Sequence, residues 1–278
     1  MANFIVGNDI STYQGEVDFT TYKNNTNFLI AKATEGIGKI DDWYGNNRQQ
    51  ARDNAIPFGS YHFARPDLGN SAVDEAKYFC DVIDGDPIKE GEVLALDFEV
   101  AYSDPVTWCL DWLNAVSEHY NGIKPLIYLN QSLVNAYDWT PVADAGYGLW
   151  LAAWSFDPNT FTGDPLHFPF IAVGQWTDKQ TVPGITGEVD GDVFFGDVSQ
   201  FKEYGYKAPQ PVEPETVQAE VVPEESAPSV DEQEQPTETP TDTEPVQPTE
   251  PLPTEVTSSN APLVTQWIDW LETQLKKL

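Results

Sequence analysis

The sequence predicts an α/β protein built on an incomplete (β/α) barrel. Three observations support this fold class. Short apolar segments typical of strands alternate with helix-like segments through roughly the first 200 residues, a pattern that favours a parallel sheet or barrel. Eight strands are separated by only five helices, and the last three strands follow one another without a convincing helix. The length of this region is at the small end for a barrel of this class.

The elements follow one another in a regular order. The candidate strands, in sequence order, are FIVGND (4–9), NFLIAKAT (27–34), PFGSYHF (57–63), VLALDFE (93–99), KPLIYLN (124–130), LWLAAW (149–154), FIAVGQW (170–176) and VDGDVFF (189–195). The helical segments that separate the first six are 17–25, 43–55, 71–83, 105–120 and 131–138.

Composition changes sharply near Ala208 and divides the chain. Residues 1–207 carry the globular region, whereas 208–258 contains no aromatic residue and no Lys or Arg, and eleven of the chain's 22 Pro. Such a segment cannot bury enough apolar surface to offset the entropy lost on ordering. Pro and like-charge repulsion extend it. We therefore predict a disordered acidic Pro/Thr/Glu linker there.

Residues 259–278 are expected to form a short amphipathic helix. Val264, Trp267, Ile268 and Leu271 follow the i, i+3, i+4, i+7 spacing of one helical face. A lone helix of this length is marginal in water, so its apolar face needs a partner. The alternatives are packing on the globular region, docking to a wall or virion component, and self-association through a short coiled coil, which we favour.

The charge balance excludes several partners. The chain has 14 Lys and Arg against 45 Asp and Glu, a formal net charge of -31 and a pI of about 4.1. Nucleic-acid binding needs a basic face, and attraction to anionic membranes or wall polymers is equally disfavoured. No segment approaches the length of a membrane span, and residues 1–11 lack the features of a signal peptide. We expect no nucleic-acid partner, no membrane insertion and synthesis in the cytoplasm.

Cysteine and histidine give no sign of a metal or a cofactor. Cys80 and Cys109 are isolated, so two buried thiols are expected, with a single bridge as the alternative. The three His show no zinc-ligand spacing. We expect neither a cofactor nor a zinc ion.

Two carboxylates interrupt the apolar strand at 93–100. Side chains alternate faces along a strand, so Asp97 and Glu99 point to the same side and Phe98 to the other. The inner side at the C-terminal end of a barrel strand is where barrel enzymes hold their catalytic groups. Two carboxyl groups this close push one pKa upward, which keeps an acid protonated near neutral pH.

Further carboxylates are expected beside this pair. Asp9 ends the first strand, and Asp190 and Asp192 lie in the last. The first and last strands of a closed barrel are neighbours, so Asp9 and Asp190 should flank the pocket that holds Asp97 and Glu99. Four carboxylates around a cleft indicate either glycoside hydrolysis or a site for a hard metal ion. No phosphate-binding Gly-rich loop or calcium-loop spacing supports the metal alternative.

Aromatic residues favour a sugar substrate. Tyr61, Tyr128 and Trp154 each fall near the C-terminal end of a strand, where an aromatic face can stack on a pyranose ring. Packing in the core is an equal alternative for each one. His62 should face outward and act as a structural histidine.

The ordered motifs of the chain resemble the family 25 glycoside hydrolases, the Chalaropsis-type lysozymes common among phage endolysins. These motifs are DIS followed by QG, then AKATEG, GSYHFARP, ALDFE, LWLAAW, VGQWTD and VPGITGEVDGDVF, covering roughly 3–204. The resemblance implies a (β/α)5β3 barrel and N-acetylmuramidase activity. Such enzymes cut the β-1,4 bond between N-acetylmuramic acid and N-acetylglucosamine in peptidoglycan.

The resemblance also assigns roles. Glu99 would be the general acid, and Asp97 either the nucleophile or the group that orients the substrate's N-acetyl group in a substrate-assisted route, which we favour. Asp9 and Asp190 would stabilise developing positive charge. The residues expected to bind substrate are Tyr61, Tyr128, Trp154, Gln175, Lys32 and Asp192.

The last motif departs from the family pattern. It reads VDGD where VDLN or VDWN is usual, so Gly191 loosens the strand and Asp192 becomes a rival to Asp190. No LysM-like, choline-binding or SH3-like module is visible after the barrel. The favoured hypothesis is a phage-type endolysin, made without a signal peptide and acting on the wall after release. The alternatives are a non-catalytic glycan-binding or virion protein on the same barrel, and a glycosidase of chitin-like polymers.

Overall fold

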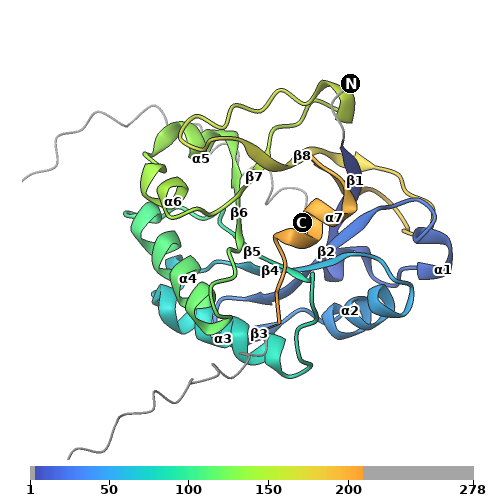
Figure 1. The fold of residues 1–278 in the computed structure, drawn as a ribbon, viewed down its shortest axis with the longest axis horizontal. Helices are drawn as coiled ribbons and strands as arrows, with labels where there is room; N and C mark the ends of the chain where they lie inside the picture. Colours follow the sequence, from blue (N-terminus) through green and yellow to red (C-terminus); the bar gives the residue numbers. More distant parts are fainter. Residues whose placement is uncertain (1–3, 209–278) are drawn as a thin grey trace, which may run out of the picture. The chain divides into compact units, whose positions relative to one another are not determined.

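The computed structural model describes residues 4–208, which form an eight-stranded barrel surrounded by helices (Figure 1). The predicted linker and terminal amphipathic helix lie outside the described residues. The barrel strands are β1 (Ile5–Ile10), β2 (Phe28–Glu35), β4 (Phe58–Phe63), β5 (Val93–Asp97), β6 (Leu126–Asn130), β7 (Leu149–Ala152), β8 (Ile171–Gln180) and β9 (Val189–Phe194). A two-residue strand, β3 (Lys39–Ile40), pairs only with β2.

Strand pairing closes the barrel as the sequence predicted. β1 pairs in parallel with β2 and antiparallel with β9, so the first and last strands are neighbours. β9 runs antiparallel to both of its neighbours, unlike the other barrel strands. The physical reason is the short connection from β8 to β9, since a parallel pair needs a crossover of a dozen or more residues.

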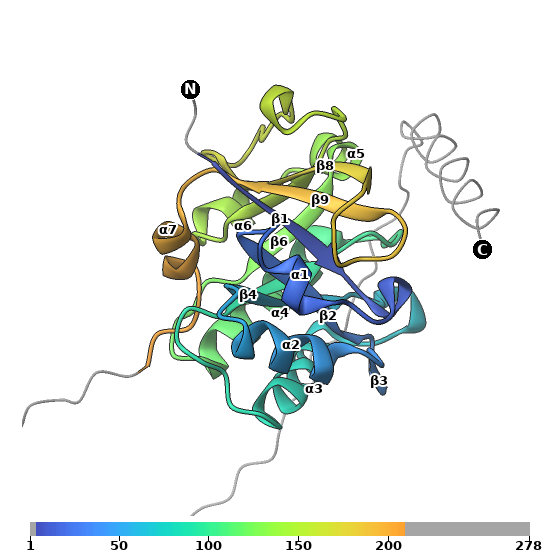
Figure 2. The same cartoon turned by 90° about the vertical axis from the view of Figure 1, so that its right-hand side faces the viewer.

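Seven α-helices lie among the described residues. They are α1 (Phe19–Tyr22), α2 (Tyr44–Asp53), α3 (Ala72–Asp84), α4 (Pro105–His119), α5 (Gln131–Ala136), α6 (Thr140–Asp144) and α7 (Val198–Glu203). Figure 2 shows α1, α2 and α3 on the outer side of the barrel around β1, β2 and β4. The first five occupy the predicted helical segments, whereas α6, α7 and β3 were not predicted. Within residues 4–208 no helix has the length and apolar character needed to cross a membrane.

Side-chain oxygens set the starts of the longer helices. Ser71 accepts a hydrogen bond from the Asp74 backbone at the start of α3, and Asp104 accepts one from the Thr107 backbone at the start of α4. Pro105 then occupies the first turn of α4, where its missing N–H is not needed.

The core has two layers, one inside the barrel and one between the strands and the helices. The inner layer holds Phe28, Ile30, Val93, Trp150 and Phe194, with Phe201 of α7 packed against it. The outer layer holds the apolar faces of the helices, with Cys80 and Cys109 as buried free thiols.

His62 belongs to the outer layer, as predicted for a structural histidine. It is fully buried, contacts Thr34 Oγ1 through Nδ1 at 2.7 Å and Glu75 Oε2 through Nε2 at 2.8 Å, and stacks on Trp112.

Candidate active site

The C-terminal ends of the parallel strands bring together carboxyl groups that are far apart in the sequence. Asp97 is the last residue of β5, and Glu99 follows just beyond the strand instead of lying within it. On the opposite side, Asp9 of β1 pairs directly with Asp190 of β9 in the antiparallel register. We call the barrel end that holds these four side chains the acidic mouth.

Asp97 and Glu99 lie within hydrogen-bonding reach of each other. The alternation that turns both inward sends Phe98 outward, where it is fully buried against Trp108. Burial raises the pKa of Glu99 to about 6. Burial, and then the charge of Glu99, raise the pKa of Asp97 well above its usual range. The pair therefore retains a proton at a pH where ordinary carboxyl groups have lost theirs.

Asp9 and Asp190 are also unfavourable places for negative charge. Burial raises the pKa of Asp9 well above its usual range, and the neighbouring Asp192 adds to this. Burial, followed by the charge of Asp9, raises the pKa of Asp190 to about 9. A ligand that brings positive charge into the mouth would therefore favour the ionised form of both side chains.

Gln175 of β8 links Asp9 to two aromatic side chains by hydrogen bonds at the mouth. Its Oε1 accepts hydrogen bonds from Tyr128 Oη at 3.0 Å and Trp154 Nε1 at 3.1 Å, while its Nε2 donates to Asp9 Oδ2 at 2.8 Å. The side chain is only 4% exposed. Gln175 was predicted to bind substrate, and its contacts equip it mainly to orient Asp9 and the two aromatic residues.

The predicted aromatic residues differ in how much of their surface they offer. Trp154 is 41% exposed beyond the end of β7, so its ring can stack on a sugar. Tyr61 and Tyr128 are almost buried, and both pack edge-to-face against Trp150, which the sequence did not single out. Little of either ring is therefore left for a ligand.

Lys32 lies on the β2 side of the mouth, where its charge opposes the upward shifts in the pKa of Asp97 and Glu99. Its Nζ pairs with Glu35 Oε2 at 2.7 Å and lies over the Phe63 ring. Burial opposes the ionisation of Glu35, but its ion pairs with Lys32 and Lys39 hold its pKa at about 2. The sequence did not single out Glu35 as a site residue. Its ion pair with Lys32 holds that side chain at the edge of the mouth.

Asp192 is placed differently from the prediction that it binds substrate. It lies one pleat below Asp190, opposite Gly7 of β1, and its exposed fraction is 0%. A sugar in the mouth therefore cannot reach it. Gly191, between the two Asp residues, faces outward, where a Cβ would come within 2.6 Å of Gln180 Oε1 and 2.9 Å of Trp176 Cε2, so a side chain at this position would require both neighbours to move.

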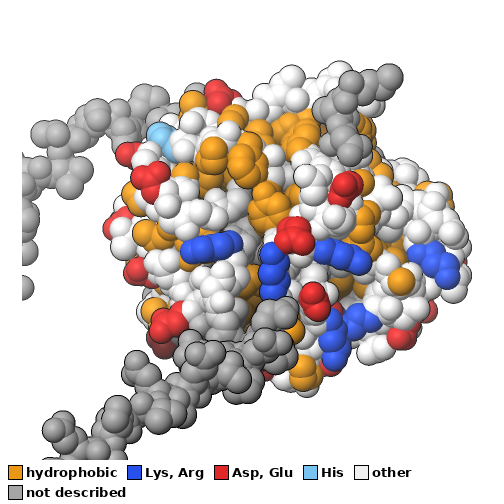
Figure 3. Space-filling view, viewed as in Figure 1, with side chains coloured by type: hydrophobic (Ala, Val, Ile, Leu, Met, Phe, Trp, Pro, Cys, Tyr) orange, Lys and Arg blue, Asp and Glu red, His pale blue; other side chains and the backbone are white. Residues whose placement is uncertain are grey.

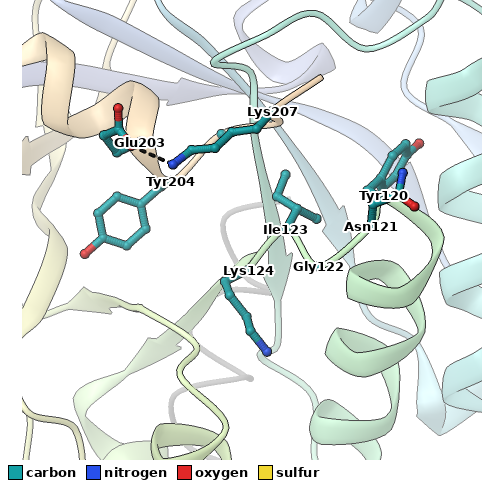
Figure 4. Close-up of a pocket in the computed structure, with 9 residues that line it drawn as sticks. Tyr120, Asn121, Gly122, Ile123, Lys124, Glu203, Tyr204 and Lys207 are labelled. Carbon is teal, nitrogen blue, oxygen red and sulfur yellow. Dashed lines mark hydrogen bonds and ion pairs between the residues drawn. The ribbon is translucent and has the colours of Figure 1, made fainter. Parts of the chain in front are cut away.

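A separate cavity lies at the opposite end of the barrel. It has a volume of about 470 Å³ and lies between the segment that leads into β6 and the residues around α7 (Figure 4). Lys124 and Lys207 lie at this cavity, but Lys124 Nζ packs over the Tyr147 ring and Lys207 Nζ pairs with Glu203 at 2.6 Å. On the face that α7 occupies, Lys and Arg side chains are interspersed with Asp and Glu (Figure 3). The cavity contains none of the groups of the acidic mouth.

Within the described range 4–208, no three His, Cys, Asp or Glu side chains are arranged to hold a metal ion together.

Comparisons with known proteins agree on one family. The model of the glycosyl hydrolases family 25 matches residues 8–185. Lysozyme M1 of Streptomyces globisporus is 29% identical over 210 residues, which cover 70% of this chain and 69% of that protein. An N,O-diacetylmuramidase of Arthroderma benhamiae is 29% identical over 222 residues, covering 73% of this chain and 87% of that one. The solved structure of the CTP1L endolysin is 27% identical, with a TM-score of 0.61, and the match covers 72% of this chain and 69% of that one.

Proposed function

Because this chain belongs to family 25 of the glycosyl hydrolases, we propose that its acidic mouth cuts the β-1,4 bond between N-acetylmuramic acid and N-acetylglucosamine in bacterial peptidoglycan. The protein is then a lysozyme that acts on the cell wall, as the names of its relatives also indicate for those proteins. The observation that carries the proposal is the Asp97–Glu99 pair, with both pKa values raised, at the C-terminal end of β5.

Glu99 is the general acid of the proposed reaction. A catalytic acid works best when its pKa lies near the working pH, and a pKa of about 6 keeps Glu99 largely protonated in mildly acidic solution. Its proton passes to the glycosidic oxygen as the C–O bond breaks, and the sugar on the other side of the bond gains positive charge at its anomeric carbon.

Asp97 fits a substrate-assisted route better than a nucleophilic one. Asp97 Oδ1 is buried without a hydrogen-bond donor among residues 4–208. This oxygen can accept the N–H of the substrate's acetamido group and turn its carbonyl oxygen toward the anomeric carbon.

Asp9 and Asp190 face the developing positive charge from the other wall. Their raised pKa values mean that the free enzyme pays a free-energy cost to ionise them, and a cationic transition state relieves that cost. Trp154 supplies the exposed ring for a neighbouring sugar, and Lys32 supplies a positively charged donor at the rim.

The substrate assignment is tested by the ends that the enzyme creates. Purified peptidoglycan is digested, the new reducing ends are reduced with borohydride, and the fragments are identified by mass spectrometry. We expect reduced N-acetylmuramic acid at the new ends. Reduced N-acetylglucosamine would contradict the assignment, and cleavage of chitin oligomers at an equal rate would indicate a glycosidase of chitin-like polymers instead.

The route is tested with an inhibitor. A thiazoline analogue, which imitates the cyclised N-acetyl group of a substrate-assisted intermediate, is expected to inhibit competitively. Trapping of a covalent fluorosugar on Asp97 would show that Asp97 is the nucleophile and would contradict the substrate-assisted route.

We further propose the role of a phage-type endolysin, made in the host cytoplasm and released to the wall by a separate protein. The similarity to the CTP1L endolysin supports this role. Self-association through 259–278 stays a prediction. Light scattering of the full chain and of a Trp267→Asp variant tests it, with a dimer expected only for the first.

A further inference from the structure

Strand β2 is irregular at the end that reaches the acidic mouth. Lys32 is paired with Tyr61 of β4. The next pair is Thr34 with His62, so Ala33 has no partner on β4 and forms a β-bulge. A bulge adds one residue to its strand and changes the direction of the side chains beside it, and bulges are frequent next to active sites.

The bulge brings Lys32 and Glu35 to the same side of the strand. Residues three apart in a regular strand point to opposite faces. Here Lys32 Nζ pairs with Glu35 Oε2 at 2.7 Å. The reason is that Ala33 and Thr34 both point outward, Ala33 into the apolar layer under the helices and Thr34 to the buried ring of His62.

Lys32 is thereby held beside the Asp97–Glu99 pair. Only 11% of its side chain is exposed, and its Nζ lies 4.6 Å from the centre of the Phe63 ring. Phe63 is the register partner of Asp97, so the ring and the carboxyl group are neighbours across β4 and β5. Burial raises the pKa of Asp97 and of Glu99, and the charge of Lys32 opposes that rise. The other titratable groups that act on Glu99 or are affected by it are Asp9 of β1, Asp190 of β9 and Tyr128 of β6.

A buried chain of hydrogen bonds holds the outward side of the bulge. Thr34 Oγ1 lies 2.7 Å from His62 Nδ1, and His62 Nε2 lies 2.8 Å from Glu75 Oε2 of α3. All three residues have an exposed fraction of 0%. Glu75 also accepts from Arg65 N and Asn70 Nδ2, as a carboxylate does. Nε2 of His62 therefore donates to Glu75, and Nδ1 is left to accept from the Thr34 hydroxyl group.

Glu75 also holds a second support for Lys32. Arg65 N donates to Glu75 Oε2 at 3.0 Å, and Arg65 Nη1 donates to Glu35 Oε1 at 3.0 Å. Because Glu35 is the ion-pair partner of Lys32, its carboxylate is fixed from the other side as well. Two sets of contacts thus connect the buried Glu75 to Lys32 in the mouth.

We propose that the buried chain Glu75–His62–Thr34 holds the β2 bulge and thereby aims Lys32 at the Asp97–Glu99 pair, so that Thr34 and His62 are positioning residues of the mouth. No covalent bond changes. The effect on hydrolysis rests on the proposed function, whereas the placement of Lys32 does not.

Substitutions of Thr34 test this role. Thr34→Val removes the hydroxyl group that donates to His62, and Thr34→Ala removes it with less bulk if the first variant does not fold. We expect the alkaline limb of kcat/KM to move upward by roughly one pH unit, because Lys32 no longer opposes the effect of burial on Glu99. Lys32→Met, which removes the charge itself, should give the same displacement. Thr34→Ser keeps the hydroxyl group and should keep the wild-type limb.

Ser60→Ala is the matched control. Ser60 also lies on β4 and is 1% exposed, and its Oγ is 2.9 Å from Tyr44 Oη of α2. Loss of this buried hydrogen bond should lower the free energy of unfolding much as Thr34→Val does, but it should leave the alkaline limb unchanged. A limb displaced equally by Ser60→Ala and Thr34→Val would show a general effect of lost stability and would overturn the proposal.

A ¹³C NMR titration of the glutamate side-chain carboxyl groups in the full chain reads the same quantity without substrate. The Glu99 signal is identified by its absence from the Glu99→Gln spectrum. Its midpoint should rise in Thr34→Val and Lys32→Met and stay unchanged in Ser60→Ala. A midpoint that does not rise in Thr34→Val, or does not rise in Lys32→Met, would overturn the proposal. A folded wild type whose variants show the expected midpoints, but which leaves peptidoglycan intact, would instead refute only the proposed function.

Discussion

Replacing Asp190 by Asn is predicted to raise the free energy of unfolding at neutral pH and to lower the activity. Its pKa is raised from the ordinary carboxyl value near 4 to about 9, so the native state holds a proton that the unfolded chain releases. Stability from this group is fully present below pH 4 and is lost as the pH rises toward 9. An Asp190→Asn variant cannot ionise, so it should escape that loss.

The size of the effect follows from linkage. One proton retained over one pH unit is worth about 1.4 kcal/mol, and from pH 4 to pH 7 there are about three units, which gives an upper value of about 4 kcal/mol at pH 7. Native wild-type Asp190 is still neutral at pH 7, so the difference arises because the unfolded wild-type chain ionises at this position and the variant does not, and about 4 kcal/mol is the upper limit. The expected gain in the free energy of unfolding at pH 7 is therefore about 2–4 kcal/mol, and about 1 kcal/mol at pH 5.

Urea unfolding of wild type and Asp190→Asn at pH 5, 7 and 8.5 measures this difference. Asp111→Asn, on the exposed face of α4, is the matched control and should change neither stability nor activity. Peptidoglycan hydrolysis by Asp190→Asn should fall at every pH. A stability difference that does not grow with pH, or a variant less stable than wild type at pH 8.5, would refute the reasoning.

Three further predictions concern the mouth. Gln175→Leu removes the donor to Asp9 and the acceptor for Tyr128 and Trp154, so kcat/KM should fall roughly 10- to 100-fold and the free energy of unfolding by about 2–4 kcal/mol, measured by hydrolysis rates and urea unfolding. Because the pKa of Glu99 is about 6, kcat/KM should decline about tenfold per pH unit well above pH 6, and a flat rate up to pH 8 would argue against Glu99 as the acid. Trp154→Ala should raise KM several-fold with a small change in kcat, and should change the free energy of unfolding by less than about 1 kcal/mol because the ring is 41% exposed.

The arrangement of the acidic mouth could be predicted from the sequence, because the alternation of side chains between the two faces of a strand is a local property. The inward direction of Asp97 and Glu99 follows from their spacing, and the pairing of Asp9 with Asp190 follows from barrel closure. Alternation does not show how deep in the barrel a side chain lies, however. Asp190 and Asp192 share a face and a residue type, yet one lies at the mouth and the other is buried below it.

Other features depend on contacts that no sequence spacing records. Gln175 was chosen from a motif, but its hydrogen bonds to three residues from different strands and loops appear only in the folded chain. The role of Trp150 likewise depends on Asp192 of β9 and on two tyrosines from β4 and β6. The antiparallel direction of β9 was within reach of the sequence, since 181–188 is too short for a helical crossover.

The most direct test of the central claim is the digestion of purified peptidoglycan by wild type, by Glu99→Gln, and by Glu118→Gln as an exposed control on α4. Circular dichroism first establishes that all three are folded. We predict new N-acetylmuramic acid reducing ends from wild type and Glu118→Gln, and a loss of at least about 100-fold in their rate of formation by Glu99→Gln. Ends formed by Glu99→Gln at the wild-type rate would contradict the account, because a glutamine cannot protonate the leaving oxygen.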